Sequence, residues 1–170
     1  MSFFSFLNIH PVDKITEKIY LGNIEGARNI EYFKKEKINY IISLAGNMFT
    51  PSYNNNNIIT FQKIIDIEDD PRENIIKYFK ECIDIIDKAN KIFIHCMAGV
   101  SRSATIVICY LMWKEKKGVN EILKKVREKR SLVGPNFGFM KQLEIFENLL
   151  KKNNYDLNKI DFKTIKWPIW

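Results

Sequence analysis

The chain has 170 residues, of which 46% are hydrophobic and 28% are charged, a composition typical of one folded domain with a substantial core. Its longest strongly apolar run, residues 104–113, is too short for a membrane span, and its start resembles neither a signal peptide nor a myristoylation site. The net charge of +7 comes from basic residues mixed with acidic ones rather than with aromatics, which argues against a nucleic-acid binder and predicts only a general attraction to phosphorylated surfaces.

Apolar segments of strand length alternate along the chain with amphipathic segments of helical period. We predict strands over residues 14–21, 38–44 and 91–95, with one or two more over residues 58–67. We predict helices over residues 25–36, 73–89, 103–115, 120–129 and 138–151. The helix over residues 103–115 is apolar nearly all round and should be buried. This alternation predicts a single α/β domain with a mostly parallel central sheet flanked by helices.

One stretch, residues 92–106, combines a strand that ends on His95-Cys96 with a tight loop and a helix that begins at Arg102. The backbone N–H groups of residues 97–102 can turn inward as an anion-binding nest, and the helix N-terminus adds partial positive charge. Arg102 supplies a planar fork that matches two phosphate oxygens. We therefore predict a cup for a tetrahedral dianion, with these residues binding the substrate: Met97, Ala98, Gly99, Val100, Ser101 and Arg102.

Cys96 would lie at the bottom of that cup. The positive field of the loop and of the helix N-terminus favours a thiolate at neutral pH. A thiolate beneath a bound phosphate can attack phosphorus and form a covalent intermediate. The pattern therefore predicts Cys96 as a catalytic nucleophile, and the cysteine and histidine spacing is not that of a zinc site.

The string His-Cys-x5-Arg-Ser resembles the signature of the cysteine-dependent protein tyrosine phosphatases, and Cys96 to Thr105 resembles their dual-specificity branch. Two flanking segments, residues 20–27 and 135–143, also resemble that family. The resemblance implies a phosphatase-like fold, a phosphorylated protein substrate and no metal or cofactor. It divides the chain into an N-terminal extension (1–12), a catalytic domain (13–150) and a C-terminal tail of unassigned role (151–170).

Attack by a thiolate leaves an alkoxide or a phenolate that a carboxylic acid should protonate. An acidic cluster, Asp66, Glu68, Asp69 and Asp70, precedes the long helix over residues 73–89. The register of this segment resembles the general-acid segment of the family and selects Asp69. Asp70 and Asp66 remain alternatives, although Asp70 is also well placed to cap the helix that begins near Glu73.

Three further residues have supporting roles in this interpretation. By resemblance, Ser103 donates a hydrogen bond to the sulfur of Cys96 and assists its departure. His95 should orient the loop through hydrogen bonds. Asn136 should bond the loop backbone, with a plain turn residue as the alternative.

The chain is short and has no evident added segment that would deepen the cup. A shallow cup should admit phosphotyrosine, phosphoserine and phosphothreonine alike. Uncharged Met97, Ala98 and Val100 make a lipid substrate less favoured, because lipid-directed relatives place lysines there. Two alternatives stay open: a phosphate-binding scaffold of low activity, and a phosphatase acting on lipid, carbohydrate or RNA phosphate. The oligomeric state stays undetermined.

Several residues outside the motif carry weaker predictions. Arg127, Lys129 and Arg130 form a basic helix end, interpreted as a solvated face, with docking of a second phosphate as the alternative. The three cysteines fit a reducing compartment, hence the cytoplasm or also the nucleus.

The other two cysteines and the terminal tryptophans have two interpretations each. Cys82 and Cys109 should be core residues, with pairing to an oxidised Cys96 as the alternative. Trp167 and Trp170 either pack on the domain or form a partner motif.

Overall fold

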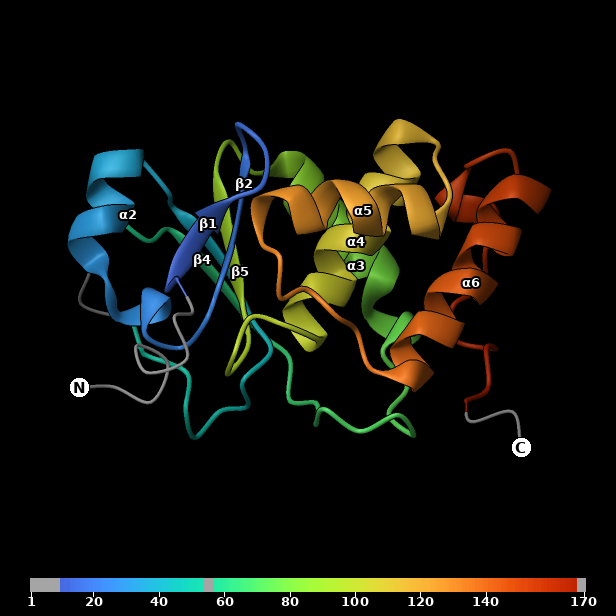
Figure 1. Cartoon of the computed structure of the whole chain (residues 1–170), viewed down its shortest axis with the longest axis horizontal. Coiled ribbons are helices and arrows are strands. Elements are labelled where there is room, and N and C mark those ends of the chain that lie inside the picture. Colours follow the sequence, from blue (N-terminus) through green and yellow to red (C-terminus); the bar gives the residue numbers. More distant parts are fainter. Residues whose placement is uncertain (1–9, 54–56, 168–170) are drawn as a thin grey trace.

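The computed structural model describes residues 10–53 and 57–167. Its middle layer is a five-stranded sheet in the order β1-β2-β5-β3-β4 (Figure 1). The strands are β1 (Val12–Lys14), β2 (Ile19–Gly22), β3 (Tyr40–Ser43), β4 (Phe61–Ile64) and β5 (Ile92–His95). Only β1 runs antiparallel to its neighbour, and the other pairs are parallel. The predicted α/β class with a mostly parallel sheet is confirmed.

Helices cover both faces of this sheet (Figure 1). One face carries α2 (Ile30–Glu36), and the other carries α3 (Phe79–Lys88), α4 (Arg102–Glu115), α5 (Val119–Lys129) and α6 (Phe137–Lys152). Short 3-10 helices are η1 (Gly26–Arg28), η2 (Ile76–Tyr78) and η3 (Leu157–Lys159). Among the described residues, no helix combines the length and the apolar character needed to cross a membrane.

The central strand β5 is apolar along its length because both of its faces are buried. Phe93 belongs to the core beneath α2, whereas Ile92 and Ile94 belong to the larger core on the other face. Successive side chains of a strand point to opposite faces, and a parallel strand covered by helices on both sides therefore reads as an uninterrupted apolar run.

Helix α4 is the buried helix that the sequence predicts. Every residue from Arg102 to Met112 is buried, and α4 packs against α3, α5, α6 and β5. Its polar first turn and its apolar remainder both lie inside the protein, so the amino end of α4 is held firmly beside the end of β5.

The predicted strand over residues 14–21 is wrong, because this segment is a β-hairpin formed by β1 and β2. Thr16 makes the turn: its hydroxyl oxygen accepts hydrogen bonds from the backbone N–H of Lys18 at 3.2 Å and of Ile19 at 3.0 Å. A threonine hydroxyl can replace a strand partner in this way, and the apolar pattern alone did not reveal it.

Two predicted helices begin later than expected. In residues 25–36 the α-helix starts at Ile30, because the side chain of Asn29 accepts a hydrogen bond from the backbone N–H of Tyr32 and caps it. In residues 73–89 regular α-helix starts at Phe79. There Gln142 of α6 bonds the backbone of residues 73 and 76, a tertiary contact that replaces the missing helical turn.

The segment predicted as one or two strands over residues 58–67 contains only β4. Beyond Ile64 the chain leaves the sheet as a loop that reaches the carboxyl ends of the strands. Ile65 and Ile67 anchor this loop in the larger core, and the acidic residues between and after them are exposed or half-buried. The apolar residues of this acidic segment therefore hold it in place, and its carboxylates are left at the protein surface.

The C-terminal segment packs on the domain as far as it is described. Ile160 and Phe162 join the larger core, and the indole N–H of Trp167 donates a hydrogen bond to Pro71 O at 2.8 Å. This contact agrees with packing of Trp167 on the domain, whereas Trp170 lies outside the described residues. Most of the predicted N-terminal extension also lies outside them, and the predicted boundaries at residues 12 and 150 stay predictions.

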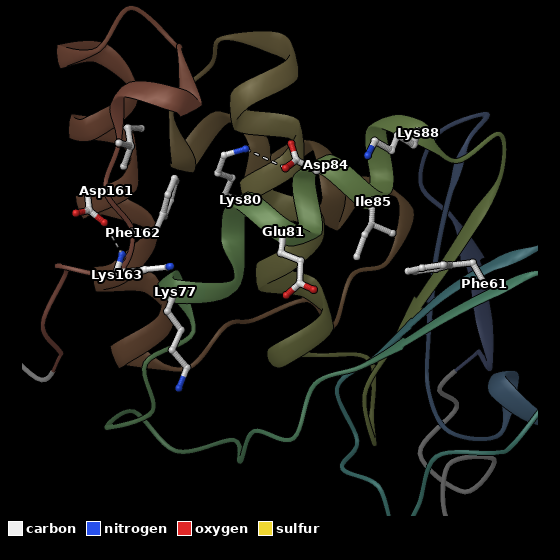
Figure 2. A pocket seen from close by; sticks show the side chains of 11 residues that line it. Phe61, Lys77, Lys80, Glu81, Asp84, Ile85, Lys88, Asp161, Phe162 and Lys163 are labelled. Atoms are coloured by element: carbon white, nitrogen blue, oxygen red, sulfur yellow. Dashed lines mark hydrogen bonds and ion pairs between the residues drawn. The ribbon is translucent and has the colours of Figure 1, made fainter.

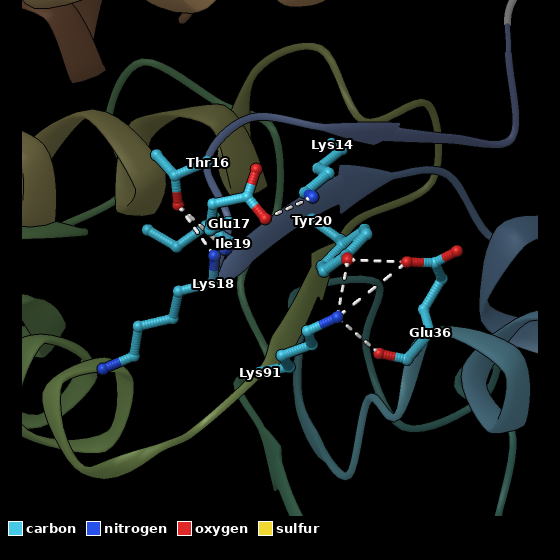
Figure 3. A network of polar contacts seen from close by, with 8 residues as sticks. All are labelled: Lys14, Thr16, Glu17, Lys18, Ile19, Tyr20, Glu36 and Lys91. Atoms are coloured by element: carbon cyan, nitrogen blue, oxygen red, sulfur yellow. Dashed lines mark hydrogen bonds and ion pairs between the residues drawn. The ribbon is translucent and has the colours of Figure 1, made fainter.

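A polar network closes the amino end of β5, opposite the end that carries Cys96 (Figure 3). Lys91 Nζ donates to the backbone oxygen of Glu36 at 2.8 Å and to the Tyr20 hydroxyl oxygen at 3.3 Å. The Tyr20 hydroxyl in turn donates to Glu36 Oε2 at 2.9 Å. These bonds tie the end of α2 to the sheet.

Candidate active site

The loop from Cys96 to Ser101 leaves the carboxyl end of β5 and leads directly into α4. In the sheet, His95 is aligned with Gly22 of β2 on one side and with Ser43 of β3 on the other. The loop therefore emerges at the centre of the carboxyl edge, where open α/β sheets bind ligands.

The carbonyl groups of this loop are bonded to groups outside it. Met97 O accepts a hydrogen bond from the backbone N–H of Ile24 at 3.1 Å, and Val100 O accepts one from Gly134 at 2.9 Å. The two carbonyl groups between them accept hydrogen bonds from Arg130. In a planar trans peptide unit the N–H points away from the C=O, so the N–H groups of residues 98–101 face the interior of the loop, four of the six that the predicted nest comprises.

Gly99 permits the sharpest bend of the loop. Its φ is +69°, a left-handed conformation that glycine adopts without steric cost. A Cβ atom at this position would lie 2.4 Å from Gly22 O, so the close approach of the loop to β2 also requires glycine. The N–H of Gly99 donates a hydrogen bond to Cys96 Sγ at 3.2 Å, which shows that its peptide unit points inward.

Cys96 lies at the base of the loop with 2% of its surface exposed. The hydroxyl of Ser103 donates to its Sγ at 3.2 Å, at the same distance as the N–H of Gly99. Two donors and the amino end of α4 stabilise negative charge on the sulfur. The contact from Ser103 is the one that its predicted role requires.

Arg102 is the first residue of α4 and is 8% exposed. Its Nη1 donates to Ile67 O at 3.1 Å, which connects the loop to the acidic segment. Its buried Nε has no hydrogen-bond partner among the described residues. A buried donor without a partner is costly, and an oxyanion held in the loop would supply one.

His95 is buried between β3 and the loop. Its Nε2 lies 2.6 Å from Ser43 Oγ and its Nδ1 lies 3.3 Å from Cys96 O. Because a carbonyl can only accept, we assign the proton to Nδ1, so that Ser43 donates to Nε2. Burial lowers the pKa of His95 to about 4, against a smaller opposing effect of its bond to Cys96 O. The imidazole is therefore neutral at pH 7 and orients the loop through hydrogen bonds.

The depressed pKa of His95 predicts a loss of stability in acid. The unfolded chain binds this proton below pH 6.5, whereas the folded protein binds it only near pH 4. The stabilisation is present above pH 6.5 and is lost as the pH falls to 4, by about 3 kcal/mol. Urea unfolding at pH 7, 5 and 4 should show a smaller loss in His95→Gln than in wild type, because carboxylates with lowered pKa values, such as that of Asp70, also lose stabilisation in acid. His10→Gln, at the exposed histidine, is the control and should retain the wild-type pH dependence; an equal dependence in His95→Gln would contradict the assignment.

The structure places Asp69 beside the loop. Its Oδ1 accepts hydrogen bonds from the hydroxyl of Ser101 at 2.7 Å and from Asn136 Nδ2 at 2.8 Å. The backbone N–H of Asn136 donates to the same Ser101 hydroxyl oxygen at 3.0 Å, and its Oδ1 caps α6 by accepting from the N–H of Phe139. The prediction that Asn136 bonds the loop backbone is therefore wrong: its backbone N–H bonds the side chain of Ser101, and its own side chain holds the Asp69 carboxylate while it caps α6.

Asp70 faces a different partner from Asp69. It forms an ion pair with Arg72, with Nη2 at 2.6 Å and Nε at 2.9 Å from its oxygens. These bonds lower the pKa of Asp70 to about 2, so it is ionised at neutral pH. Its predicted role as a cap for a helix at Glu73 is also wrong, because it closes a turn by accepting from the Arg72 N–H. Asp66 is exposed on the same loop, next to the turn at Gly46.

Arg130 contradicts the prediction of a solvated basic helix end. Arg127 and Lys129 are exposed, but Arg130 is only 3% exposed and its guanidinium contacts the loop. A signal was present in the sequence. Arg130 follows the buried Ile122 and Val126 at intervals of four, so it continues the buried face of α5.

The other two cysteines are free and fully buried. Burial raises the pKa of both the Cys82 and the Cys109 thiols, so both are neutral at physiological pH. This placement agrees with their interpretation as core residues in the larger core.

A groove of about 710 Å³ runs along the outer side of α3, away from the loop (Figure 2). It is lined by residues of β4, α3 and the segment after η3, and includes none of the residues from His95 to Ser103. Among its charged lining residues, Lys80 pairs with Asp84, and Glu81 pairs with Lys63 of β4, but none of its lining residues is a cysteine, serine, threonine or histidine. The groove therefore adds no nucleophile to the centre around Cys96.

Comparison with known proteins agrees with this geometry. Residues 19–149 match the family described as "Dual specificity phosphatase, catalytic domain". The chain is 36% identical over 142 residues to dual specificity protein phosphatase 9 of Homo sapiens, and 31% identical over 146 residues to dual specificity protein phosphatase 1B of Arabidopsis thaliana. The match covers 81% and 84% of this chain, respectively, but 36% of the human protein and 85% of the Arabidopsis protein.

Solved structures show the same fold. The crystal structure of human tyrosine phosphatase-like serine/threonine/tyrosine-interacting protein superposes with a TM-score of 0.77 at 30% sequence identity, covering 82% of this chain and 97% of that one. The sequence match extends over most of the described domain and includes the strand, loop and helix that hold Cys96. The chain belongs to the dual specificity phosphatase family.

Proposed function

We propose that this chain is a cysteine-dependent protein phosphatase that hydrolyses phosphotyrosine, phosphoserine and phosphothreonine through a cysteinyl-phosphate intermediate. The observation that carries the proposal is the buried Cys96 Sγ with two hydrogen-bond donors, at the base of a loop whose N–H groups face inward. Relatives named dual specificity protein phosphatases support the reaction class. The three free cysteines fit a reducing compartment, and we propose the cytoplasm, or also the nucleus, as its location.

In the first step, Cys96 Sγ attacks phosphorus and the bond from phosphorus to the leaving oxygen breaks. The loop N–H groups and Arg102 bind the other three phosphoryl oxygens, where the transition-state charge develops. Asp69, in its protonated form, gives its proton to the leaving oxygen. Its bonds to Ser101 and Asn136 support this role because they hold the carboxyl group beside the loop.

In the second step, water attacks the cysteinyl-phosphate and the bond between sulfur and phosphorus breaks. Asp69, now ionised, takes a proton from that water, and inorganic phosphate leaves. Ser103 donates its hydrogen bond to Sγ and so stabilises the departing thiolate. His95 stays neutral throughout, because burial keeps its pKa near 4.

A phosphate-binding scaffold of low activity is less favoured. A module of that kind has no need for a nucleophile, whereas this chain retains Cys96 and Ser103 in contact. A lipid substrate is also less favoured, because no lysine occurs within residues 96–102.

Matched peptides carrying phosphotyrosine, phosphoserine or phosphothreonine test this function with wild type and Asp69→Asn. Wild type should hydrolyse all three without added metal and in the presence of a chelator. The variant should lose about 10²-fold on phosphotyrosine, and more on phosphoserine, because an alkoxide is a more basic leaving group than a phenolate.

Asp70→Asn is the control, because it removes a neighbouring carboxylate that pairs with Arg72, and it should leave the rates within about twofold. Hydrolysis of phosphoinositides or RNA 5′-phosphates but of none of the peptides would refute a protein phosphatase. An Asp69→Asn variant as active as wild type would refute the general-acid role.

A further inference from the structure

Arg130 lies immediately after α5 and has no part in the two chemical steps, yet its buried guanidinium contacts the catalytic loop. Its Nε donates to Gly99 O at 2.8 Å and its Nη2 donates to Ala98 O at 2.9 Å. These are successive carbonyl groups at the sharpest bend of the loop. The planar fork of an arginine can bond two such acceptors at once, whereas a lysine offers a single charged point.

The remaining nitrogen of the guanidinium is held from the opposite side. Nη1 of Arg130 donates to Asp13 Oδ2 at 2.6 Å and to His10 O at 2.8 Å. Asp13 belongs to β1 and its side chain is 18% exposed, against 3% for Arg130. The ion pair therefore fixes the plane of the guanidinium between the N-terminal strand and the loop.

The geometry of one peptide unit links Arg130 to the nucleophile. In the unit between Ala98 and Gly99, the carbonyl oxygen bonds Arg130 and the N–H bonds Cys96 Sγ at 3.2 Å. The next unit is held in the same way, with Gly99 O bonded to Arg130. Because each unit is planar and trans, the contact of Arg130 with the oxygens sets the direction of two N–H groups inside the loop.

We propose that Arg130, oriented by Asp13, is a positioning residue that aims the N–H groups of Gly99 and Val100 at the thiolate and at the bound phosphoryl group. The inference rests on the proposed phosphatase function of the same loop. Without the guanidinium, the two peptide units are free to rotate, and the loop loses aligned donors. Misplacement of a donor by about 1 Å can cost about 10²-fold in rate.

The variants Arg130→Met and Arg130→Lys test the proposal. Arg130→Met should lower kcat/KM on an aryl phosphate by about 10- to 100-fold. It should also weaken binding of tungstate, a tetrahedral oxyanion, in a Cys96→Ser background. Alkylation of Cys96 by iodoacetamide at a fixed neutral pH should become slower, because the N–H of Gly99 is no longer aimed at Sγ. Arg130→Lys should restore part of each effect.

Lys91→Met is the matched control. Lys91 is half-buried rather than buried, but like Arg130 it is a cation that bonds a backbone carbonyl and lies near a carboxylate (Figure 3). It lies at the other end of β5 from Cys96, so its loss should lower thermal stability while leaving kcat/KM, tungstate binding and the rate of Cys96 alkylation within about twofold of wild type.

Either of two results would overturn the proposal. In the first, Arg130→Met stays within threefold of wild type in kcat/KM and in tungstate affinity. In the second, Lys91→Met loses as much of both as Arg130→Met, which would trace the effect to stability alone. If Arg130→Met does not fold, Asp13→Asn replaces it and should lower kcat/KM by about 3- to 10-fold; an unchanged value overturns the proposal. Tungstate binding needs no turnover, so it decides the role of Arg130 even if wild type fails to hydrolyse any phosphate ester.

Discussion

Replacement of Cys96 by serine should lower kcat/KM for phosphopeptides and for an aryl phosphate by about 10⁴-fold or more, which leaves only background hydrolysis. A serine hydroxyl stays protonated at neutral pH and is a poor nucleophile without a general base. The substitution changes little else, because Cys96 is 2% exposed and both of its donors, from Gly99 and Ser103, can bond an oxygen as well. Thermal stability and tungstate binding should therefore be retained.

Steady-state kinetics and acid quenching of a labelled phosphopeptide measure this effect. Wild type should show transient label on the protein, and Cys96→Ser should show none. Cys109→Ala is the matched control, because it removes a buried thiol from α4 without touching the loop; it should lower stability and keep the activity. Wild-type rates in Cys96→Ser would rule out the cysteinyl-phosphate route.

The second large effect is expected for Arg102→Lys, which should lower kcat/KM by about 10²- to 10³-fold and weaken tungstate binding. The variant keeps the positive charge, so a loss of kcat/KM would measure the contribution of the planar guanidinium geometry. Arg102 can present a planar pair of donors to two phosphoryl oxygens while Nη1 stays bonded to Ile67 O at 3.1 Å. A lysine can do only one of these at a time, and its flexible ammonium group is not held in the plane of the loop.

Arg72→Lys is the control for Arg102→Lys. Arg72 is an exposed arginine paired with Asp70 on the acidic loop, so the same chemical change there should alter kcat/KM by no more than about twofold. Full activity in Arg102→Lys would show that charge alone is sufficient at this position, and it would contradict bidentate binding of the phosphoryl group.

Local patterns in the sequence were sufficient to predict the part of the site that lies within one continuous segment, from β5 through the loop to α4. The apolar run before His95 predicted β5, and the apolar segment after Arg102 predicted the buried helix α4. Elements that are apolar on all sides are stable only when neighbouring elements cover them. A loop of this length between a strand and a buried helix can close only as a tight turn, and Gly99 allows its positive φ. The position of Cys96 at the helix N-terminus follows from spacing alone.

Contacts between distant segments could not be read in this way. Asp69 and Asp70 are adjacent and chemically alike, and the resemblance in register selected Asp69 without showing its contacts. The tertiary structure shows them: Asp69 bonds Ser101 and Asn136, whereas Asp70 pairs with Arg72. Side-chain hydrogen bonds also explain the turn at Thr16 and the late start of α3. In the first case a bond to Thr16 replaces a continuous strand, and in the second a bond to Gln142 replaces a helical turn, although the apolar period favoured the regular element in both.

The sequence by itself determined the α/β class, the strand, loop and helix around Cys96 and the types of residue available for phosphoryl transfer, because these depend on apolar period and on spacing along one segment. Only the tertiary structure decided that Ser101 and Asn136 hold the Asp69 carboxylate, and that Arg130, 31 residues from Gly99, bonds the loop carbonyl groups and pairs with Asp13. The helical period of α5 places Arg130 on the buried face of the helix, but the acceptors that hold its guanidinium come from other segments, and the sequence does not show which ones they are.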